Sequence, residues 1–333
     1  MKEMHNPYLM FLGDVADQLA AKTAKGIVDW RPDWCSGQLR LPGCKADLGI
    51  ADMGIAEAVE NGARTMIVGI VNSGGFLPDH WISVITEALD AGLDVASGLH
   101  IRLGSIPEIK AAAERNGRTL FDVRHPTQTI PTGKGTPRSG KRLLAVGTDC
   151  SIGKMYTALA LEKEMKARGM KADFRATGQT GIFIAGSGIS IDAVVADFIS
   201  GAVEMLSPAN DADHWDLIEG QGSLFHASYA GVSLGLLHGA QADALILCHE
   251  PTRIHMRGLP HMPIPGLEEC MELNLALARL TNKNAAFYGI AINSSGLPEE
   301  ARTDYLASVE KRLGLPTVDP FRDGTARIVD NLP

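Results

Sequence analysis

The chain has 333 residues, of which 45% are hydrophobic, and its formal net charge of −8 argues against nucleic acid as a main partner. Its length predicts about two domains of ~150 residues each. Five cysteines without CxxC spacing argue against structural zinc or a disulfide framework. The sequence shows neither an apolar leader nor an apolar run of ~18 residues, which predicts a cytoplasmic protein without a membrane partner.

The first part of the chain alternates short apolar strands with helices. This βαβ rhythm predicts an α/β fold with a Rossmann-like parallel sheet in an N-terminal domain, residues 1–125. The glycine-rich segments 72–78 and 97–100 follow two of the strands. We expect each either to border a cleft or to form a tight turn. The predicted strands are residues 8–12, 47–51, 65–71, 93–96 and 119–123. The predicted helices are residues 14–25, with Asp14 as N-cap, 56–61, 81–91 and 107–116.

A Pro-, Thr- and Gly-rich stretch, residues 126–141, interrupts this pattern and is predicted to be a linker. Strands and helices then alternate again, which predicts a C-terminal domain over residues 142–333 with a second parallel sheet of the P-loop NTPase type. Its predicted strands are residues 143–146, 172–176, 215–219, 244–248 and 286–292. Its predicted helices are residues 156–168, 191–205, 230–239, 265–280 and 299–313.

A glycine-rich loop with a lysine follows the first strand of this second domain, between Gly147 and Lys154. Such a loop points backbone N–H groups at an anion, and the following helix N-terminus and the lysine add positive potential. The sequence therefore predicts a bound phosphate group, and an ordinary turn with a surface lysine is the alternative. The predicted binding residues are Gly147, Thr148, Asp149, Cys150, Ser151, Ile152, Gly153, Lys154, Met155 and Tyr156.

The loop departs from the P-loop pattern at two positions. Thr148 stands where the first glycine is expected, and Met155 stands where a Ser or Thr would bind magnesium. Because a thioether does not replace a hydroxyl on a hard cation, we expect phosphate binding without a required metal.

Polar residues also follow the other predicted strands of this domain, where open α/β sheets bind their ligands. They are residues 177–180, 219–223, 249–250 and 293–295. Glu219 precedes a glycine that lets a ligand approach, so we expect it to act as a general base. A metal ligand and a turn cap are the alternatives for Glu219.

The histidines His226, His249, His255 and His261 come after the Glu219 turn in the sequence. An imidazole titrates near neutral pH, so each is able to shuttle a proton. We take His226 and His249 as catalytic candidates beside Glu219, with packing or hydrogen bonding as the alternative. Their spacing does not match a zinc motif.

Two arginines, Arg253 and Arg257, are spaced as i and i+4. One helical turn would place both on one side, where two guanidinium forks suit a dicarboxylate ligand. A solvated basic surface is the alternative.

Cys150 lies inside the loop, where amide groups and Lys154 are expected to lower the pKa of its thiol. This predicts either a covalent acyl-cysteine or, as the simpler alternative, a small filler side chain.

These motifs carry a family resemblance. Gly147-Thr-Asp, Gly153-Lys154 and Glu219-Gly-x-Gly resemble the dethiobiotin-synthetase branch of P-loop proteins, although Met155 and the preceding Rossmann-like half depart from that branch. Nearly the whole chain, including Gly-Thr-Asp-Cys-x-x-Gly-Lys-Met and the segments 97–100 and 249–258, is similar to a bacterial family long known as a domain of unknown function. Its members are assigned as D-glutamate N-acetyltransferases of D-amino-acid catabolism.

The resemblance implies acetyl transfer from acetyl-CoA, as co-substrate, to the amine of D-glutamate or a similar D-amino acid. The loop would hold the phosphates of CoA, Arg253 and Arg257 would pair with the carboxylates of glutamate, and Glu219 or a histidine would take the amine proton. An ATP-dependent ligase or kinase is one alternative, and a non-catalytic CoA- or nucleotide-binding module is another. We expect small-molecule partners and a homo-oligomer.

Overall fold

The computed structural model describes residues 4–70 and 77–333. The chain forms two compact units: the first holds Met1–Gln128 and Gly178–Ala193, and the second holds Thr129–Thr177 and Val194–Pro333. Among the helices of the described residues, none combines the length and apolar character needed to cross a bilayer.

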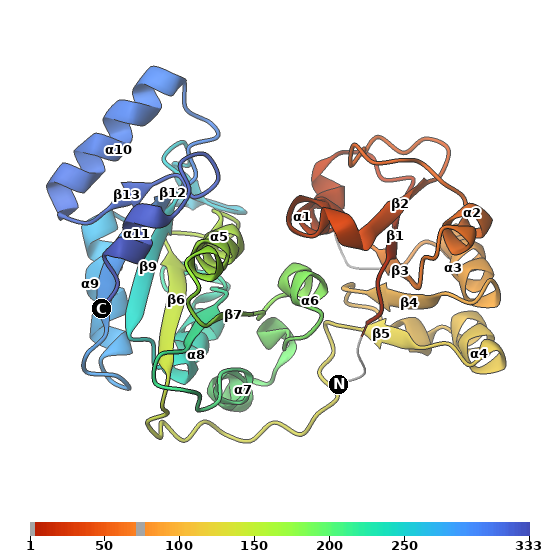
Figure 1. Cartoon of the computed structure of the whole chain (residues 1–333), viewed down its shortest axis with the longest axis horizontal. Coiled ribbons are helices and arrows are strands. Elements are labelled where there is room, and N and C mark those ends of the chain that lie inside the picture. The colour runs from red at the N-terminus through yellow and green to blue at the C-terminus, as the bar shows by residue number, and fades with distance from the viewer. Residues whose placement is uncertain (1–3, 71–76) are drawn as a thin grey trace. The chain divides into compact units, whose positions relative to one another are not determined.

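The first unit is built on a five-stranded sheet in which all neighbouring strands are parallel, in the order β2-β1-β3-β4-β5 (Figure 1). Its strands are β1 (Tyr8–Gly13), β2 (Cys35–Arg40), β3 (Thr65–Val68), β4 (Asp94–Ser97) and β5 (Leu120–Asp122). Its helices are α1 (Lys22–Trp30), α2 (Ile55–Glu60), α3 (Asp79–Asp90), α4 (Pro107–Asn116) and α6 (Gln179–Ala185). The strand order reverses direction at β1, so the carboxyl ends of β1 and β3 form a topological switch point.

The second unit holds a six-stranded parallel sheet in the order β13-β12-β9-β6-β8-β7. Its strands are β6 (Lys141–Gly147), β7 (Ala172–Arg175), β8 (Trp215–Ile218), β9 (Ala244–His249), β12 (Ala286–Ile292) and β13 (Thr317–Val318), and a separate antiparallel hairpin pairs β10 (His255–Met256) with β11 (Leu259–Pro263). Its helices are α5 (Lys154–Ala167), α7 (Ile199–Leu206), α8 (Ala230–Ala240), α9 (Leu267–Ala278), α10 (Glu299–Leu313) and α11 (Ala326–Asp330). Short 3-10 turns cover Leu19–Ala21, Pro32–Trp34, Leu103–Ser105, Ile191–Ala193 and Ala196–Phe198.

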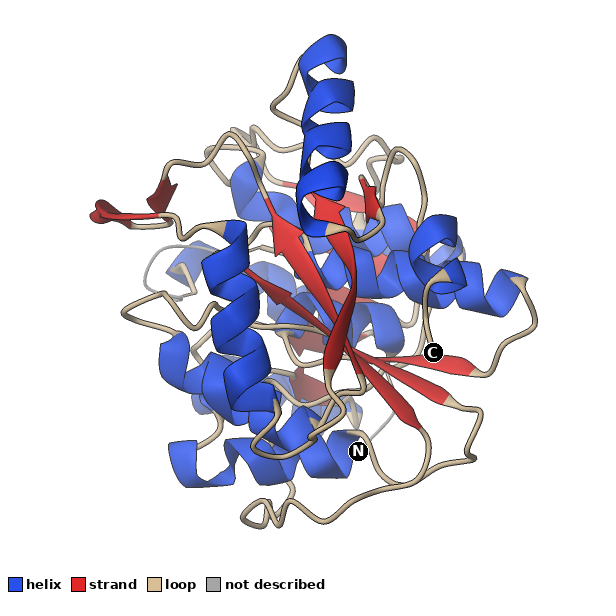
Figure 2. Ribbon diagram, turned by 90° about the vertical axis from the view of Figure 1, so that its left-hand side faces the viewer, coloured by secondary structure: helices blue, strands red, loops and turns tan. Residues whose placement is uncertain are grey.

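Strand β6 lies inside the second sheet and is covered on both faces, which explains its apolar run from Leu143 to Val146. Leu143 and Ala145 pack in one cluster with side chains of α5 and α11. The alternate residues Leu144 and Val146 face a small cavity that α8 and α9 also line. Figure 2 shows the strands of this sheet with helices on either side of them. The two-residue period of a strand therefore directs successive apolar residues into two separate helical layers.

The α/β class, the Rossmann-like first sheet and the P-loop-type second sheet are confirmed, but three predicted elements are wrong. Residues 14–25 do not form one helix, because the Asp14 carboxylate accepts a hydrogen bond from the indole of Trp81 instead of capping a helix, and α1 begins at Lys22. Residues 47–51 are not a strand; β2 takes that edge of the sheet. Residues 191–205 are helical as α7 only from Ile199.

Besides β2, the predicted set also lacks helices α6 and α11, the β10–β11 hairpin and strand β13. Most of the glycine-rich segment 72–78 and residue 71 of the predicted strand lie outside the described residues.

Helix α8 packs against α7 through glycines. A Cβ atom on Gly239 would lie 2.4 Å from the carbonyl oxygen of Ser200, and one on Gly235 would lie 2.7 Å from Cγ2 of Ile199. Both distances are shorter than real Cβ contacts, so the backbones of α7 and α8 approach closely only because these positions are glycine.

We therefore expect Gly239→Ala to lower the free energy of unfolding by about 1–3 kcal/mol through overpacking. Gly231→Ala in the same helix is the matched control, because nothing lies within 4 Å of a Cβ there, and it should raise the free energy of unfolding by up to ~1 kcal/mol. Urea denaturation measures the free energy of unfolding of both variants. Equal changes in the two variants would contradict the close contact between α7 and α8.

Candidate phosphate-binding site

The loop from Thr148 to Gly153 joins β6 to α5 and is shaped by its glycines. A Cβ atom on Gly147 would lie 2.6 Å from Cδ1 of Ile152 and 3.0 Å from the carbonyl oxygen of Cys248, so the chain leaves the strand where a larger residue would collide. Gly153, the N-cap of α5, has φ +109°, a conformation that favours glycine. The N–H groups of the first turn of α5, which have no acceptor within the helix, therefore open directly from this loop.

The lysine of the loop is buried. Lys154 is 6% exposed, and its Nζ donates a hydrogen bond to the carbonyl oxygen of Asp149 at 2.6 Å. Within residues 4–70 and 77–333 this is the one hydrogen bond of an ammonium group that has three donors. Desolvation by burial lowers the pKa of Lys154, with nearby thiols and Asp149 acting in the opposite direction. A bound anion would therefore stabilise a cation that is incompletely solvated.

Asp149 and Arg253 fix the shape of the loop. The Asp149 side chain is fully buried, and its Oδ2 accepts hydrogen bonds from Nη1 of Arg253 and from the backbone N–H of Arg257, both at 2.8 Å. Burial raises the pKa of Asp149, but the hydrogen bonds from Arg253 and from the backbone of Cys150 and Arg257 outweigh it and leave the pKa below its usual value. Arg253 also donates to the carbonyl oxygen of Cys150 at 2.6 Å and to Glu250 at 2.6 Å.

The predicted pairing of Arg253 and Arg257 on one helical turn is wrong. The segment is a turn followed by the β10–β11 hairpin, and Arg253 is used to hold the loop. Arg257 meets Asp149 through its backbone, and its exposed guanidinium has no hydrogen-bond partner within the part of the chain that the structure describes. Of the two arginines, Arg257 is therefore the one whose side chain is available to a ligand.

His249 joins the loop from the end of β9. Its Nδ1 lies 2.9 Å from Oγ1 of Thr148 in a buried hydrogen bond. Desolvation, followed by the charges of Arg253 and Arg312, lowers the pKa of His249 to about 4. The imidazole is therefore neutral and only weakly basic at neutral pH, and Thr148 fixes its orientation.

Glu219 links the ends of β8 and β7. Its Oε2 accepts a hydrogen bond from the backbone N–H of Thr177 at 2.9 Å, while the Thr177 hydroxyl donates to the carbonyl oxygen of Glu219 at 2.7 Å. Both residues are buried. A Cβ atom on the next residue, Gly220, would lie 2.9 Å from Cδ of Lys154 and 1.7 Å from the carbonyl oxygen of Ala145. The Glu219 turn thus packs directly on the stem of the lysine.

His226 is held by two backbone groups. Its Nδ1 accepts a hydrogen bond from the N–H of Ser228 at 3.2 Å, and its Nε2 lies 3.0 Å from the carbonyl oxygen of Arg257. Only the neutral tautomer with the proton on Nε2 satisfies both contacts. The ring also stacks on Tyr229 with centroids 4.5 Å apart. His226 therefore positions the segment that carries Arg257.

Asp149, Cys150 and His226 bring their polar atoms within 4.8 Å of one another, as a metal site would. Yet both nitrogens of His226 are engaged, and the guanidinium of Arg253 lies against Asp149. This donor set does not suit a cation.

Burial also raises the pKa of the Cys150 thiol to about 11. A thiol with this pKa is not an effective nucleophile at neutral pH, which favours the role of a filler side chain over an acyl-cysteine.

The structure thus brings four of the predicted strand ends together around the loop: Thr148, Thr177, Glu219 and His249. The end of β12 joins them, because the N–H of Asn293 donates to the carbonyl oxygen of His249 at 2.8 Å. Gln179 and Thr180 belong to the first unit, where they start α6. Ser223, which the sequence did not indicate as catalytic, donates to the carbonyl oxygen of Thr148 at 3.1 Å.

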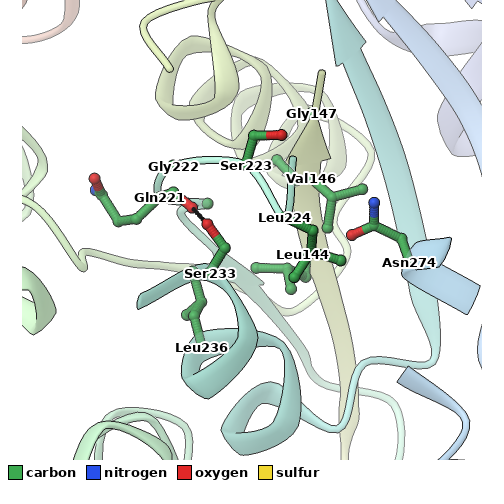
Figure 3. Close-up of a pocket in the computed structure, with 12 residues that line it drawn as sticks. Leu144, Val146, Gly147, Gln221, Gly222, Ser223, Leu224, Ser233, Leu236 and Asn274 are labelled. Carbon is green, nitrogen blue, oxygen red and sulfur yellow. Dashed lines mark hydrogen bonds between the residues drawn. The ribbon is translucent and has the colours of Figure 1, made fainter. Parts of the chain in front are cut away.

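Behind the loop lies a small cavity, shown in Figure 3. Leu144 and Val146 of β6, Leu236 of α8 and Asn274 of α9 are among the residues that line it. Its volume of about 10 Å³ accommodates roughly one water molecule. The cavity is too small for a substrate.

An aromatic pair flanks the start of α5. The rings of Tyr156 and Phe321 lie 6.3 Å apart, and Phe321 is 74% exposed. The turn that carries Phe321 is fixed by Asp319, whose Oδ1 accepts hydrogen bonds from the backbone N–H of Phe321 at 3.0 Å and of Arg322 at 3.2 Å. Sequence reasoning missed Phe321, which lies far from the loop along the chain.

Comparisons with known proteins agree on one family. A model described as "Domain of unknown function (DUF1611_C) P-loop domain" matches residues 129–329, and one described as "Domain of unknown function (DUF1611_N) Rossmann-like domain" matches residues 39–126. A protein of Tritonibacter scottomollicae named "D-glutamate N-acetyltransferase" is 56% identical over 99% of both chains. A Pseudoalteromonas protein of the same name is 50% identical over 98% of both.

A crystal structure of a DUF1611 family protein from Anabaena variabilis ATCC 29413 is 30% identical, with a TM-score of 0.87 over 98% of this chain and 99% of that chain.

The pKa of His249 predicts a specific pH dependence of stability. The folded state holds this pKa near 4, below the ordinary value of 6.5, so between these pH values the unfolded chain binds a proton that the folded chain does not. Stability is therefore lost as the pH falls through this window. At ~1.4 kcal/mol per pKa unit, His249 accounts for about 3 kcal/mol of the loss.

His249→Asn keeps a polar group near the Nδ1 position and removes the titration, so its free energy of unfolding should fall less between pH 6.5 and pH 4. Urea denaturation at each pH tests this, with His261→Asn on the exposed hairpin as the control. Identical pH profiles for His249→Asn and the wild type would contradict the assignment.

Proposed function

This chain belongs to the DUF1611 family, and we propose that it is an N-acetyltransferase that moves an acetyl group from acetyl-CoA to the amine of D-glutamate or a similar D-amino acid in its catabolism. The observation that carries the proposal is full-length similarity to two proteins named D-glutamate N-acetyltransferase. The geometry of the loop supports the choice of donor.

The loop suits the phosphates of an acyl carrier. Lys154 and the N–H groups of the first turn of α5 offer positive charge and donors to a diphosphate. Met155 occupies the position after the lysine, so the loop lacks the hydroxyl that positions magnesium for phosphate cleavage. Acetyl transfer breaks the thioester and leaves the phosphates intact, so it needs no such hydroxyl.

The aromatic pair of Tyr156 and Phe321 suits the adenine end of CoA. Phe321 exposes an apolar ring beside the first turn of α5, and aromatic rings stack favourably on nucleobases. We propose that the adenine of the donor contacts this ring. The N–H groups of the loop would remain available to stabilise an oxyanion or a phosphate oxygen.

Arg257 is the proposed contact for a carboxylate of the acceptor, because its guanidinium is exposed while Arg253 is engaged by the loop. The acceptor amine must lose a proton before it attacks the thioester. His226 and His249 are poor proton acceptors here, since one has both nitrogens bonded and the other has a pKa near 4. Glu219 remains a candidate for this step, although Thr177 binds its carboxylate.

The direct test is thiol release. Purified protein should liberate free CoA thiol from acetyl-CoA when D-glutamate is added, and mass spectrometry should find N-acetyl-D-glutamate. Reactions without an amino acid, and reactions with ATP and magnesium in place of acetyl-CoA, are the controls. Formation of ADP with no thiol release from any D-amino acid would replace the proposal with a ligase or kinase activity.

Lys154→Ala should raise the KM for acetyl-CoA by about 10- to 100-fold, the range expected for the loss of a charge-assisted hydrogen bond. Lys163→Ala is the matched control, since Lys163 lies on the same helix and is exposed. Steady-state kinetics at saturating D-glutamate measure both variants. An unchanged donor KM in a folded Lys154→Ala protein would show that the phosphates bind elsewhere.

A further inference from the structure

The turn that carries Phe321 also exposes an arginine. This turn covers residues 319–323 of the second unit, directly after β13, and both Phe321 and Arg322 are exposed there. The function proposed above places the adenine of CoA on Phe321 and assigns no role to Arg322. The contacts that hold the 319–323 turn indicate a role for this arginine.

A buried aspartate anchors the turn to the sheet. Asp319 is 4% exposed, and its Oδ2 accepts hydrogen bonds from the backbone N–H of Ser294 at 3.1 Å and from the Ser294 hydroxyl. Ser294 is itself fully buried and lies just after β12. The other oxygen of Asp319 accepts the N–H groups of Phe321 and Arg322. One carboxylate therefore joins the ends of two strands to the backbone of both exposed residues.

A buried arginine of α10 supports the same turn. Nε of Arg302 donates to the hydroxyl oxygen of Ser294 at 3.2 Å, and its Nη2 pairs with Asp323. Asp323 in turn accepts the N–H of Asp319 at 2.9 Å. Charged groups are costly to bury unless they are hydrogen-bonded, and a satisfied network of this kind specifies one conformation. The turn therefore presents Phe321 and Arg322 in a fixed arrangement.

The guanidinium of Arg322 has a partner that a ligand is able to replace. Its Nη1 donates to Oε2 of Glu299 at 3.1 Å, and the side chains of Arg322 and Glu299 are 41% and 71% exposed. Glu299 also pairs with Arg302, so it keeps a cation when Arg322 leaves. Exposed ion pairs contribute little to stability, whereas a guanidinium binds a phosphate group through two parallel hydrogen bonds. A phosphate group is therefore a suitable replacement for Glu299 as the partner of Arg322.

The covalent structure of CoA carries a phosphate close to its adenine. The ribose that joins the adenine to the diphosphate bears a further phosphate on its 3′ oxygen. The 319–323 turn lies beside the helix that starts at the loop: the ring of Phe321 is 6.3 Å from that of Tyr156, and the Thr325 hydroxyl donates to the carbonyl oxygen of Ala160 at 3.1 Å. An adenine on Phe321 and a diphosphate at Lys154 would leave the 3′-phosphate near this turn.

We propose that Arg322 binds the 3′-phosphate of CoA, and that the 319–323 turn thereby distinguishes CoA from carriers that lack this group. The inference rests on the proposed function, because it takes CoA as the carrier and places its adenine on Phe321. Dephospho-CoA and ATP have a hydroxyl group at the 3′ position and would leave Arg322 paired with Glu299. Arg322 is thus a specificity-determining residue and takes no part in the bond changes of acetyl transfer.

The test is calorimetry of the full-length protein with CoA and with dephospho-CoA. The wild type should bind CoA about ten times more tightly than dephospho-CoA, the ratio expected for one charge-assisted hydrogen bond. Arg322→Ala should bring this ratio close to one by weakening CoA binding alone. Arg327→Ala is the matched control, because Arg327 is an exposed arginine of α11 that pairs with Glu310, and it should keep the wild-type ratio.

Glu299→Gln supplies a variant that gains affinity. Removing the carboxylate that competes for Arg322 should tighten CoA binding by about two- to fivefold, the range of an exposed ion pair, and leave dephospho-CoA binding unchanged. A variant that merely disturbs the turn would weaken the binding of both carriers. Weaker CoA binding by Glu299→Gln would therefore contradict the proposal.

Equal affinity of the wild type for the two carriers, or a tenfold ratio that survives in Arg322→Ala, would overturn the proposal even if the protein releases CoA thiol with D-glutamate. Calorimetry measures binding without turnover, so a protein that fails to release thiol still reports the ratio. In that case the acetyl transfer fails, while a ratio that depends on Arg322 retains the 3′-phosphate site. Absence of binding of either carrier would overturn the site together with the choice of CoA.

Discussion

The buried ammonium of Lys154 is the constraint on which the architecture of the second unit depends. Placing a charged group among apolar strands is costly unless hydrogen bonds or an opposite charge compensate it, and this ammonium has a carbonyl oxygen as its hydrogen-bond partner in the described structure. The surroundings maintain the arrangement: Gly220 lets the Glu219 turn pack on the lysine stem, and Gly147 lets the chain turn sharply out of β6. We propose that this arrangement prepares the site for an anion before one binds.

A second layer of contacts keeps the loop in that shape. Arg253 binds the Asp149 carboxylate and the carbonyl of Cys150, and Thr148 binds His249. Arg253 and His249 are candidates for substrate binding and catalysis when they are read from the sequence, yet both are engaged in holding the loop. A phosphate site requires such support, because amide groups bind an anion well only when they are already aligned. The chemistry of proton transfer is then left to residues outside this layer.

Much of the fold was predictable because its signals are local. The continuous apolar runs that became β6, β9 and β12, and the glycine that ends α4, lie within single elements. The errors arose where tertiary contacts decide. Strand β2 contains Ser36, Gly37 and Gln38, which give an edge strand no apolar pattern, and Asp14 is drawn to a tryptophan more than sixty positions away rather than to its own helix.

The site, like the fold, was predictable where its signals are local and not where distant residues meet. The glycine–lysine loop follows from contiguous residues, whereas the engagement of Arg253 depends on Asp149, which lies 104 positions earlier. The excursion of Gly178–Ala193 into the first unit is likewise invisible in the order of strands and helices.

A crystal structure of the protein with CoA tests the central claim most directly. The account predicts the diphosphate within hydrogen-bond distance of Nζ of Lys154 and of backbone N–H groups between Cys150 and Tyr156, with Arg253 still bound to Asp149. Well-ordered CoA whose phosphates lie away from this loop would contradict it.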